Sequence, residues 1–153
     1  MVMVENIKYE GKTIARIIGA EELGGPFKFF TEDSDNIQIS RWNHPIGYKC
    51  KPHMHNIVNK TIERTHEAIF VLHGEIKVTF FSFEGQFITS RILVAPCICY
   101  SMDCGHGYEV YSKDTRVIEF KNGPFLGDEH YDKERTLLDD WLDPNNFFAH
   151  EQV

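Results

Sequence analysis

The sequence has no run of about 18 consecutive apolar residues, the length at which a membrane-spanning helix is expected. Its first residues also lack the basic and apolar regions of a secretory signal. We therefore expect a cytoplasmic protein that has no membrane partner. Thiols are reduced in that compartment, and the sequence has no CxxC pair of the kind that holds structural zinc. The cysteines are Cys50, Cys97, Cys99 and Cys104.

Positive charge is scarce, because 16 Lys and Arg residues face 23 Asp and Glu residues and give a formal net charge of −7. This balance argues against nucleic acid as a partner. A Gly-rich phosphate loop and a nucleophile elbow are also missing, which argues against a kinase or a serine hydrolase. An anionic substrate stays open, since a metal ion or a local group of Lys and Arg reverses the field inside a pocket.

Aromatic residues, by contrast, are plentiful. The hydrophobic content is 42%, and twelve Phe and six Tyr favour strands over helices. The 153 residues contain no internal repeat and predict one domain with a sizeable core. Turn signals rich in Gly, Pro, Asn and Asp recur between short apolar runs, which is typical of an antiparallel sandwich or barrel. The predicted strands are 4–9, 12–18, 37–43, 47–54, 67–73, 75–82, 86–94, 97–102, 106–111 and 115–121.

The C-terminal part has a different pattern. Residues 132–142 predict a helix, because apolar side chains recur there at helical spacing and Asp143-Pro144 ends the pattern. The apolar side chains are Leu137, Leu138, Trp141 and Leu142. We expect this helix to pack on the outside of the barrel or against a partner subunit.

A candidate metal site begins at His53-Met54-His55. Two histidines two positions apart on a strand point to the same face. With Glu67 and His106 on neighbouring strands, they would form a set of three imidazoles and one carboxylate. Such a set suits one divalent transition metal, and Fe, Zn, Mn and Ni all fit it. Glu63 is an alternative to Glu67 as the carboxylate. Each histidine taken alone is more commonly an ordinary strand or loop residue.

Tyr108, Glu119 and Lys121 are the candidate catalytic residues. Tyr108 has the strand parity of His106, and Glu119 has the parity of Lys121. If the two strands pair antiparallel around the turn at 113–114, both faces meet in one cavity. Lys121, buried beside a cation, would have a lowered pKa and act as a neutral base. The alternative for Glu119 and Lys121 is a solvated charge pair on a strand.

Three segments carry a family resemblance: 42–56 (WNHPIGYKCKPHMHN), 64–81 (RTHEAIFVLHGEIKVTFF) and 104–128 (CGHGYEVYSKDTRVIEFKNGPFLGD). Gly47-x5-His53-x-His55 followed by Glu67-x6-Gly74 resembles the first cupin motif. The chain is similar to small single-domain cupins, and more specifically to those encoded among bacterial surface-polysaccharide biosynthesis genes. It departs from the motif in the eleven residues between His55 and Glu67. We interpret these residues as a longer hairpin loop.

The resemblance implies an all-β fold, a cupin jelly roll or antiparallel β-barrel with a short C-terminal helix, as a single domain over 1–153. The barrel would cover about 37–125, after an N-terminal hairpin at 4–18 and before the helix at 132–142. It also implies the metal site, with Cys104 as a loop thiol beside it.

The function that the resemblance favours is an isomerase or epimerase acting on a small polar molecule, a sugar or nucleotide-sugar of surface-polysaccharide biosynthesis. An Fe(II)-dependent oxygenase and a non-catalytic ligand-binding cupin are the alternatives, so whether the chain is an enzyme stays open. We expect a homodimer, because cupins commonly pair through exposed strand edges. Strand 4–9 and the helix around Trp141 are the expected contacts.

Overall fold

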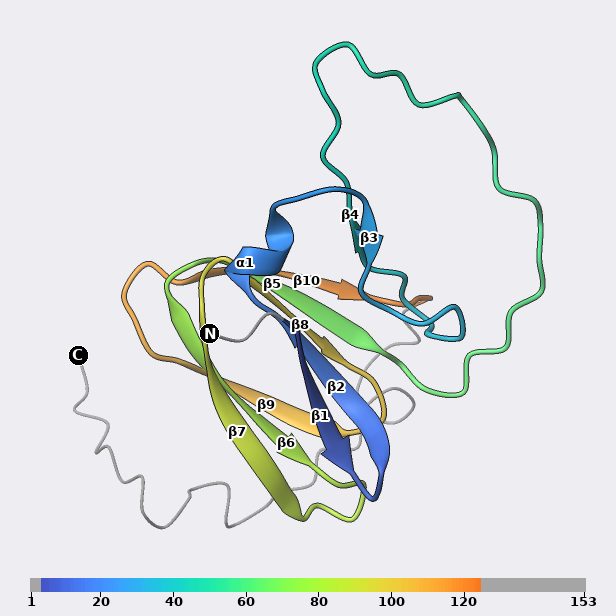
Figure 1. Cartoon of the computed structure of the whole chain (residues 1–153). Coiled ribbons are helices and arrows are strands. Elements are labelled where there is room, and N and C mark those ends of the chain that lie inside the picture. Colours follow the sequence, from blue (N-terminus) through green and yellow to red (C-terminus); the bar gives the residue numbers. More distant parts are fainter. Residues whose placement is uncertain (1–3, 125–153) are drawn as a thin grey trace. The chain divides into compact units, whose positions relative to one another are not determined.

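The computed structural model describes residues 4–124, and Figure 1 shows their arrangement. The elements are β1 (Val4–Tyr9), β2 (Lys12–Ile18), α1 (Ala20–Leu23), β3 (Lys28–Phe29), β4 (Ser40–Arg41), β5 (Glu67–His73), β6 (Glu75–Phe81), β7 (Phe87–Val94), β8 (Cys97–Ser101), β9 (Gly105–Val110) and β10 (Arg116–Lys121). The all-β prediction is confirmed for this part of the chain. No helix in it is long and apolar enough to cross a membrane.

The strands form two larger antiparallel sheets and one small sheet. The five-stranded sheet has the order β1-β2-β8-β5-β10, the three-stranded sheet has the order β7-β6-β9, and β3 pairs with β4. β1 and β2 form the N-terminal hairpin that the sequence predicts. β9 and β10 each have only one neighbour, so the described strands do not close into a barrel.

The core lies between the two larger sheets and follows from the alternation of side chains along each strand. Ile69 and Val71 of β5 face Val78 and Phe80 of β6 in one buried cluster. Cys97 and Cys99 of β8 belong to the same cluster as two small buried side chains on one strand face. Burial raises the pKa of the Cys97 thiol to about 11. These thiols therefore act as apolar packing groups.

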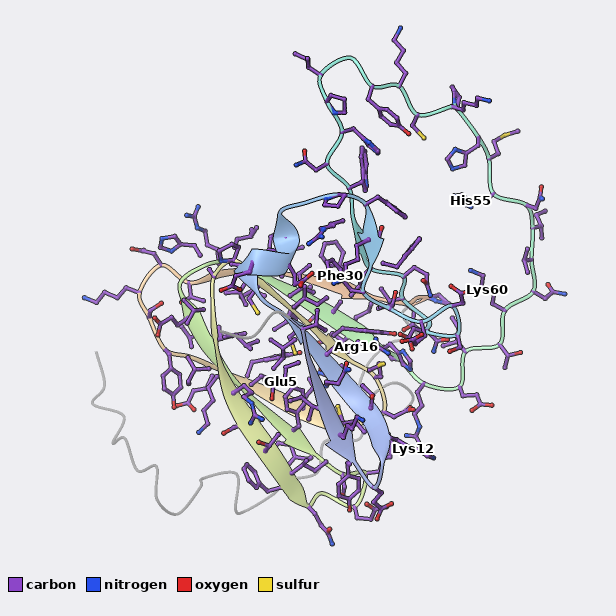
Figure 2. All side chains as sticks on the ribbon, viewed as in Figure 1. Glu5, Lys12, Arg16, Phe30, His55 and Lys60 are labelled. Atoms are coloured by element: carbon purple, nitrogen blue, oxygen red, sulfur yellow. The ribbon has the colours of Figure 1, made fainter. Side chains whose placement is uncertain are left out.

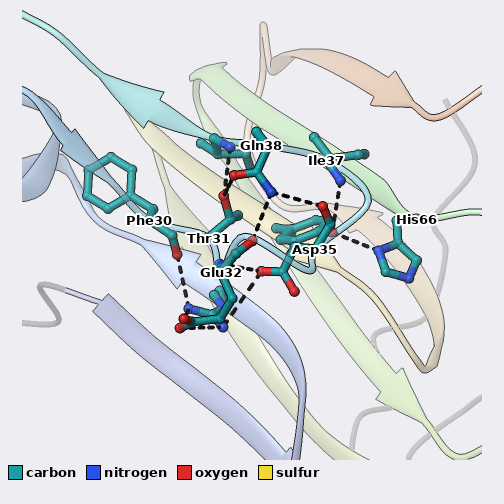
Figure 3. A network of polar contacts seen from close by, with 10 residues as sticks. Phe30, Thr31, Glu32, Asp35, Ile37, Gln38 and His66 are labelled. Carbon is teal, nitrogen blue, oxygen red and sulfur yellow. Dashed lines mark hydrogen bonds and ion pairs between the residues drawn. The ribbon is translucent and has the colours of Figure 1, made fainter. Parts of the chain in front are cut away.

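The outer face of the five-stranded sheet is partly covered by the chain between β3 and β4. Ala68, Tyr100 and Met102 pack there against Ile37 and Ile39. Figure 3 shows the polar contacts that hold this segment in place. The Ile37 N–H donates to the Tyr100 hydroxyl at 3.3 Å, and the Arg16 guanidinium donates to the Phe30 carbonyl at 3.1 Å.

The predicted strand over 47–54 is wrong, and only Ser40–Arg41 of the predicted strand 37–43 pairs. Residues 42–66 instead leave the body of strands and return to it at β5 (Figure 1). The physical reason is that a strand needs a neighbour to satisfy its backbone groups, and no described strand pairs with this segment. The predicted helix at 132–142 lies outside the described residues.

Candidate functional site

Glu67, the first residue of β5, is the centre of a polar cluster between the two larger sheets. Its side chain is nearly buried, and the whole residue is only 6% exposed. Tyr108 of β9 donates its hydroxyl to Glu67 Oε1 at 2.9 Å, and His106 Nε2 lies 3.2 Å from the same oxygen. Lys121 of β10 contacts the other oxygen, Oε2, at 3.1 Å, and Glu119 at 2.7 Å. Five of the seven predicted site residues therefore lie in this cluster, with Glu119 joined to Glu67 through Lys121.

Strand register explains why these side chains converge. His106 and Tyr108 lie opposite Phe80 and Val78 of β6, which are both completely buried. Because residues directly opposite in a sheet share a face, His106 and Tyr108 also point toward the core. In the other sheet, Lys121 lies opposite Glu67 by the same rule.

The predicted pairing of the strands around 113–114 is wrong, although their faces do meet. β9 pairs with β6, and β10 pairs with β5 in the other sheet. The connection between them crosses the β5–β6 turn at Gly74, where Ser112 Oγ accepts a hydrogen bond from the Glu75 N–H at 2.8 Å. Because of this contact, β9 and β10 do not form a hairpin, and β10 pairs with β5 in the other sheet. The site therefore forms across the two layers rather than along one hairpin.

The partners of Glu67 keep its carboxyl group ionised. Burial by itself would raise the pKa of Glu67, but the hydrogen bond and charge of His106, with the donors Tyr108 and Lys121, lower it to about 2. Burial and the neighbouring carboxylate raise the pKa of Tyr108, so this residue stays a hydrogen-bond donor. The cluster therefore holds one buried carboxylate in its charged form.

Lys121 is charged in this cluster, which corrects the predicted neutral base. Burial alone would lower the pKa of Lys121, but the hydrogen bonds and charges of Glu119 and Glu67 outweigh it and raise the pKa. From the sequence, we expected burial and a nearby cation to lower the pKa of Lys121. In the structure the Lys121 side chain keeps 24% of its surface exposed and touches two carboxylates. It can therefore bind an anionic group.

The structure brings together two of the four predicted metal ligands, Glu67 and His106. His53 and His55 lie instead in the exposed segment 42–66, with their ring centroids 5.3 Å apart. The alternative carboxylate, Glu63, is exposed in the same segment. Within residues 4–124, no group of three His, Cys, Asp or Glu side chains is arranged to hold a metal ion. The complete ligand set stays a prediction.

The donors that do meet suit a metal ion. A ligand carboxylate must be ionised, and Glu67 is. His106 turns Nε2 toward this carboxylate, while its other ring nitrogen, Nδ1, is buried and finds no hydrogen-bond partner among the described residues. A buried polar atom without a partner is costly and is rare in folded proteins. The pair of Glu67 and His106 therefore fits a cation, through either the carboxylate or the free nitrogen.

Cys104 lies in the loop between β8 and β9, and its thiol is buried. It is buried in the core cluster and donates from Sγ to the Ile14 carbonyl at 3.4 Å. Burial raises the pKa of this thiol to about 12. A protonated thiol is a poor metal ligand, so we assign Cys104 to packing.

Sequence reasoning missed Asn122, which fixes the ends of both strands at the site. Its side-chain oxygen accepts the His66 N–H at 2.6 Å, and its own N–H donates to the His66 carbonyl at 3.4 Å. His66 precedes Glu67, and Asn122 follows Lys121, so these bonds extend the β5–β10 ladder by one residue. Asn122-Gly123-Pro124 predicted only a turn, although an asparagine at a strand end commonly bonds backbone.

In comparisons with known proteins, no family model, no curated protein and no solved structure matches the chain.

Proposed function

We propose that the chain is a metal-binding cupin that isomerises or epimerises a sugar or nucleotide-sugar in surface-polysaccharide biosynthesis. The observation that supports this most is the buried, ionised Glu67 in contact with His106, Tyr108 and Lys121. Two facing antiparallel sheets are also what a jelly roll requires, once its open side is closed. Strongly shifted pKa values gathered at one point favour a functional site over an ordinary ion pair.

The proposed metal ligands are Glu67 and His106, completed by His53 and His55. The chain makes this set feasible because the segment that carries His53 and His55 ends at His66, the neighbour of Glu67. A carboxylate with imidazoles suits Fe, Zn, Mn or Ni. When bound, such an ion would polarise a carbonyl or hydroxyl group of the substrate.

Glu119, Lys121 and Tyr108 would have different roles in the proposed proton transfer. Glu119, half exposed beside Lys121, can accept a proton from the carbon next to a carbonyl. The Lys121 ammonium can hold an anionic group of the substrate. The protonated Glu119 can then return the proton to the carbon. Tyr108 donates to Glu67 and so orients its carboxylate. Lys121 is thus the proposed anion-binding group, and Glu119 is the proposed base and acid.

A non-catalytic ligand-binding cupin is the second candidate. The observation in its favour is that Lys121 is a charged group paired with two carboxylates, which suits the binding of an anion better than the removal of a proton. In this case the same residues would hold a ligand without turning it over.

Two measurements test these proposals. Elemental analysis of the purified protein should find a transition metal in the wild type and in Glu63→Gln, and much less in Glu67→Gln. A nucleotide-sugar that carries a keto group, incubated with the protein in D2O, should then exchange the hydrogen next to that carbonyl, as read by NMR. Ligand binding without deuterium exchange would select the non-catalytic cupin. Equal metal content in wild type and Glu67→Gln would remove the metal site.

A further inference from the structure

Residues 42–66, named here the strap, are held at both ends, and residues 43–63 make no hydrogen bond with the described strands. At one end, Arg41 Nε donates to the Pro26 carbonyl at 2.9 Å. At the other end, the Arg64 guanidinium lies 3.7 Å from the centre of the Phe83 ring. Figure 2 shows His55 and Lys60 on the strap, well away from the sheets. The strap is therefore tethered to the body of strands next to Glu67.

The strap exposes apolar side chains that proteins normally cover. Ile46, Met54 and Ile57 are 105%, 94% and 101% exposed. Within the strap there is one backbone–backbone hydrogen bond, from the Tyr48 N–H to the Pro45 carbonyl at 3.1 Å, and the His53 Nδ1 atom lies 3.0 Å from the Lys51 carbonyl oxygen. The strap lies in no sheet. If this extended segment added to a sheet, it would bury apolar surface and pair its backbone N–H and C=O groups, and both changes are favourable.

The sheets offer a place for it. β9 and β10 are edge strands on the side where the two larger sheets stay open. Val110 of β9 lies opposite the buried Ile76, and Val117 of β10 lies opposite the buried Val71, yet both valines are exposed. Their faces point toward the core, and no residue of 4–124 covers them. An open edge with uncovered apolar side chains favours the pairing of a further strand.

The sequence of the strap matches this place. Over 47–54 polar and apolar residues alternate, with Lys49, Lys51 and His53 on one face and Tyr48, Cys50 and Met54 on the other. The core-facing side of β9 is polar where it carries His106 and Tyr108, so the histidine face can point inward there. Pro52 lacks an N–H and fits only an edge strand, which a strand added beside β9 would be.

We propose that the strap is a metal-dependent strand: residues 47–54 add to the free edge of β9 when a divalent cation binds, and leave it when the cation is removed. This inference rests on the proposed metal site, and it adds the conformational response to that site. Without a cation, closure would bring Lys49 and Lys51 toward the Lys121 ammonium and would cost the backbone entropy of the strap. Bonds from His53 and His55 to a cation held by Glu67 and His106 offset that cost.

The test is hydrogen–deuterium exchange of the full chain in chelator and with Zn2+, Ni2+ or Mn2+ added singly. With a bound cation, we expect amides of 47–54 and of β9 to exchange about tenfold more slowly or slower still, because both become ladder donors. Amides of the β1–β2 hairpin should not change. The double variant His53→Ala, His55→Ala should lose this protection. His44→Ala, a strap histidine outside the proposed strand, is the matched control and should keep it.

Both variants change exposed strap residues, so neither removes a core contact. The possible failures are distinguishable by elemental analysis and light scattering of the same samples. Bound metal without protection would overturn the moving strand and leave the metal site in place. Full protection in chelator would also overturn it, since the strand would then be permanently attached. No bound metal would overturn both proposals. If protection appears together with a mass twice that measured in chelator, residues 47–54 add to a second copy of the chain.

Discussion

At the scale of the residue, Glu67 combines burial with a full negative charge. A buried carboxylate is costly unless charged and hydrogen-bonding partners surround it. Here Tyr108, His106 and Lys121 supply three contacts between 2.9 and 3.2 Å. Each partner comes from a different position on β9 or β10, so the charge state of Glu67 reports on whether the two sheets are correctly packed.

The stability of the metal-free protein should therefore depend on pH through Glu67. The pKa of this group is lowered to about 2 in the folded state, so its contribution is fully present above the pKa of the unfolded chain, about 4.3. It is lost as the pH falls from there toward about 2, and on the order of 2–3 kcal/mol is at stake. Urea unfolding in chelator at several pH values would measure this. Wild type and Glu67→Gln should converge in acid, and parallel curves would contradict the assignment.

Lys121→Met should separate ligand binding from metal binding. The substitution removes the ammonium that contacts Glu67 and Glu119, while Glu67 and His106 remain. We expect metal content near that of the wild type and a loss of nucleotide-sugar binding of about tenfold or more, the effect of about 1.4 kcal/mol. Calorimetry and elemental analysis measure the two. Lys113→Met, an exposed lysine in the turn between β9 and β10, is the control. Unchanged binding in Lys121→Met would reduce this lysine to a structural partner of Glu67.

At the scale of the element, the strands between residues 67 and 121 could be predicted to within one or two residues. Alternation and turn residues decide where such strands begin and end, and both are local features. Strand partners are not local. The separation of β9 from β10 depends on contacts of Ser112 and Thr115 with the turn at Gly74. The predicted strand over 47–54 has the right alternation but lacks a neighbour, which no local pattern reveals.

Gly74→Ala should be more costly than a comparable change elsewhere. Gly74 has φ of +81°, and an added Cβ would lie 2.5 Å from Thr115 Oγ1 and 2.9 Å from Thr115 Cα. Gly11 has φ of +79° and nothing within 4 Å of an added Cβ. Both variants should be destabilised by backbone strain on the order of 1 kcal/mol. The difference between their free energies of unfolding therefore measures the steric contact with Thr115. We expect Gly74→Ala to lower the free energy of unfolding by about 1–3 kcal/mol more than Gly11→Ala. Equal losses of stability in the two variants would show that the chain around Ser112 and Thr115 moves to make room for the added Cβ.

Asn122→Ala should loosen the end of the β5–β10 ladder beside the site. It removes the acceptor of the His66 N–H, which would cost about 1–2 kcal/mol. Hydrogen exchange at His66 and Glu67 should become faster, while exchange in the β6–β7 hairpin stays the same. Asn6→Ala, at an exposed asparagine of β1, should leave both unchanged. If the His66 amide remains fully protected in Asn122→Ala, the side chain of Asn122 does not extend the ladder.

At the scale of residues 4–124 as a whole, the two sides of the sandwich differ. On one side, Arg91 of β7 bonds Glu5 of β1 at 2.6 and 2.9 Å and so joins the two sheets. On the other side, the polar cluster at Glu67 connects β9 with β5 and β10. The proposed strand would cover this second side. The polar cluster lies on this second side.

The same strand order leaves β1 as a free edge of the five-stranded sheet. An unpaired edge presents N–H and C=O groups that favour pairing with another chain, and the Glu5–Arg91 pair holds this edge in place. We therefore expect a homodimer through β1, with light scattering in chelator giving twice the chain mass of 17.8 kDa. Amides of β1 should gain protection as the concentration rises. Those of β7, the corresponding edge of the three-stranded sheet, should not. A mass of 17.8 kDa at high micromolar concentration would contradict the dimer, and protection of β7 alone would move the contact to the other sheet.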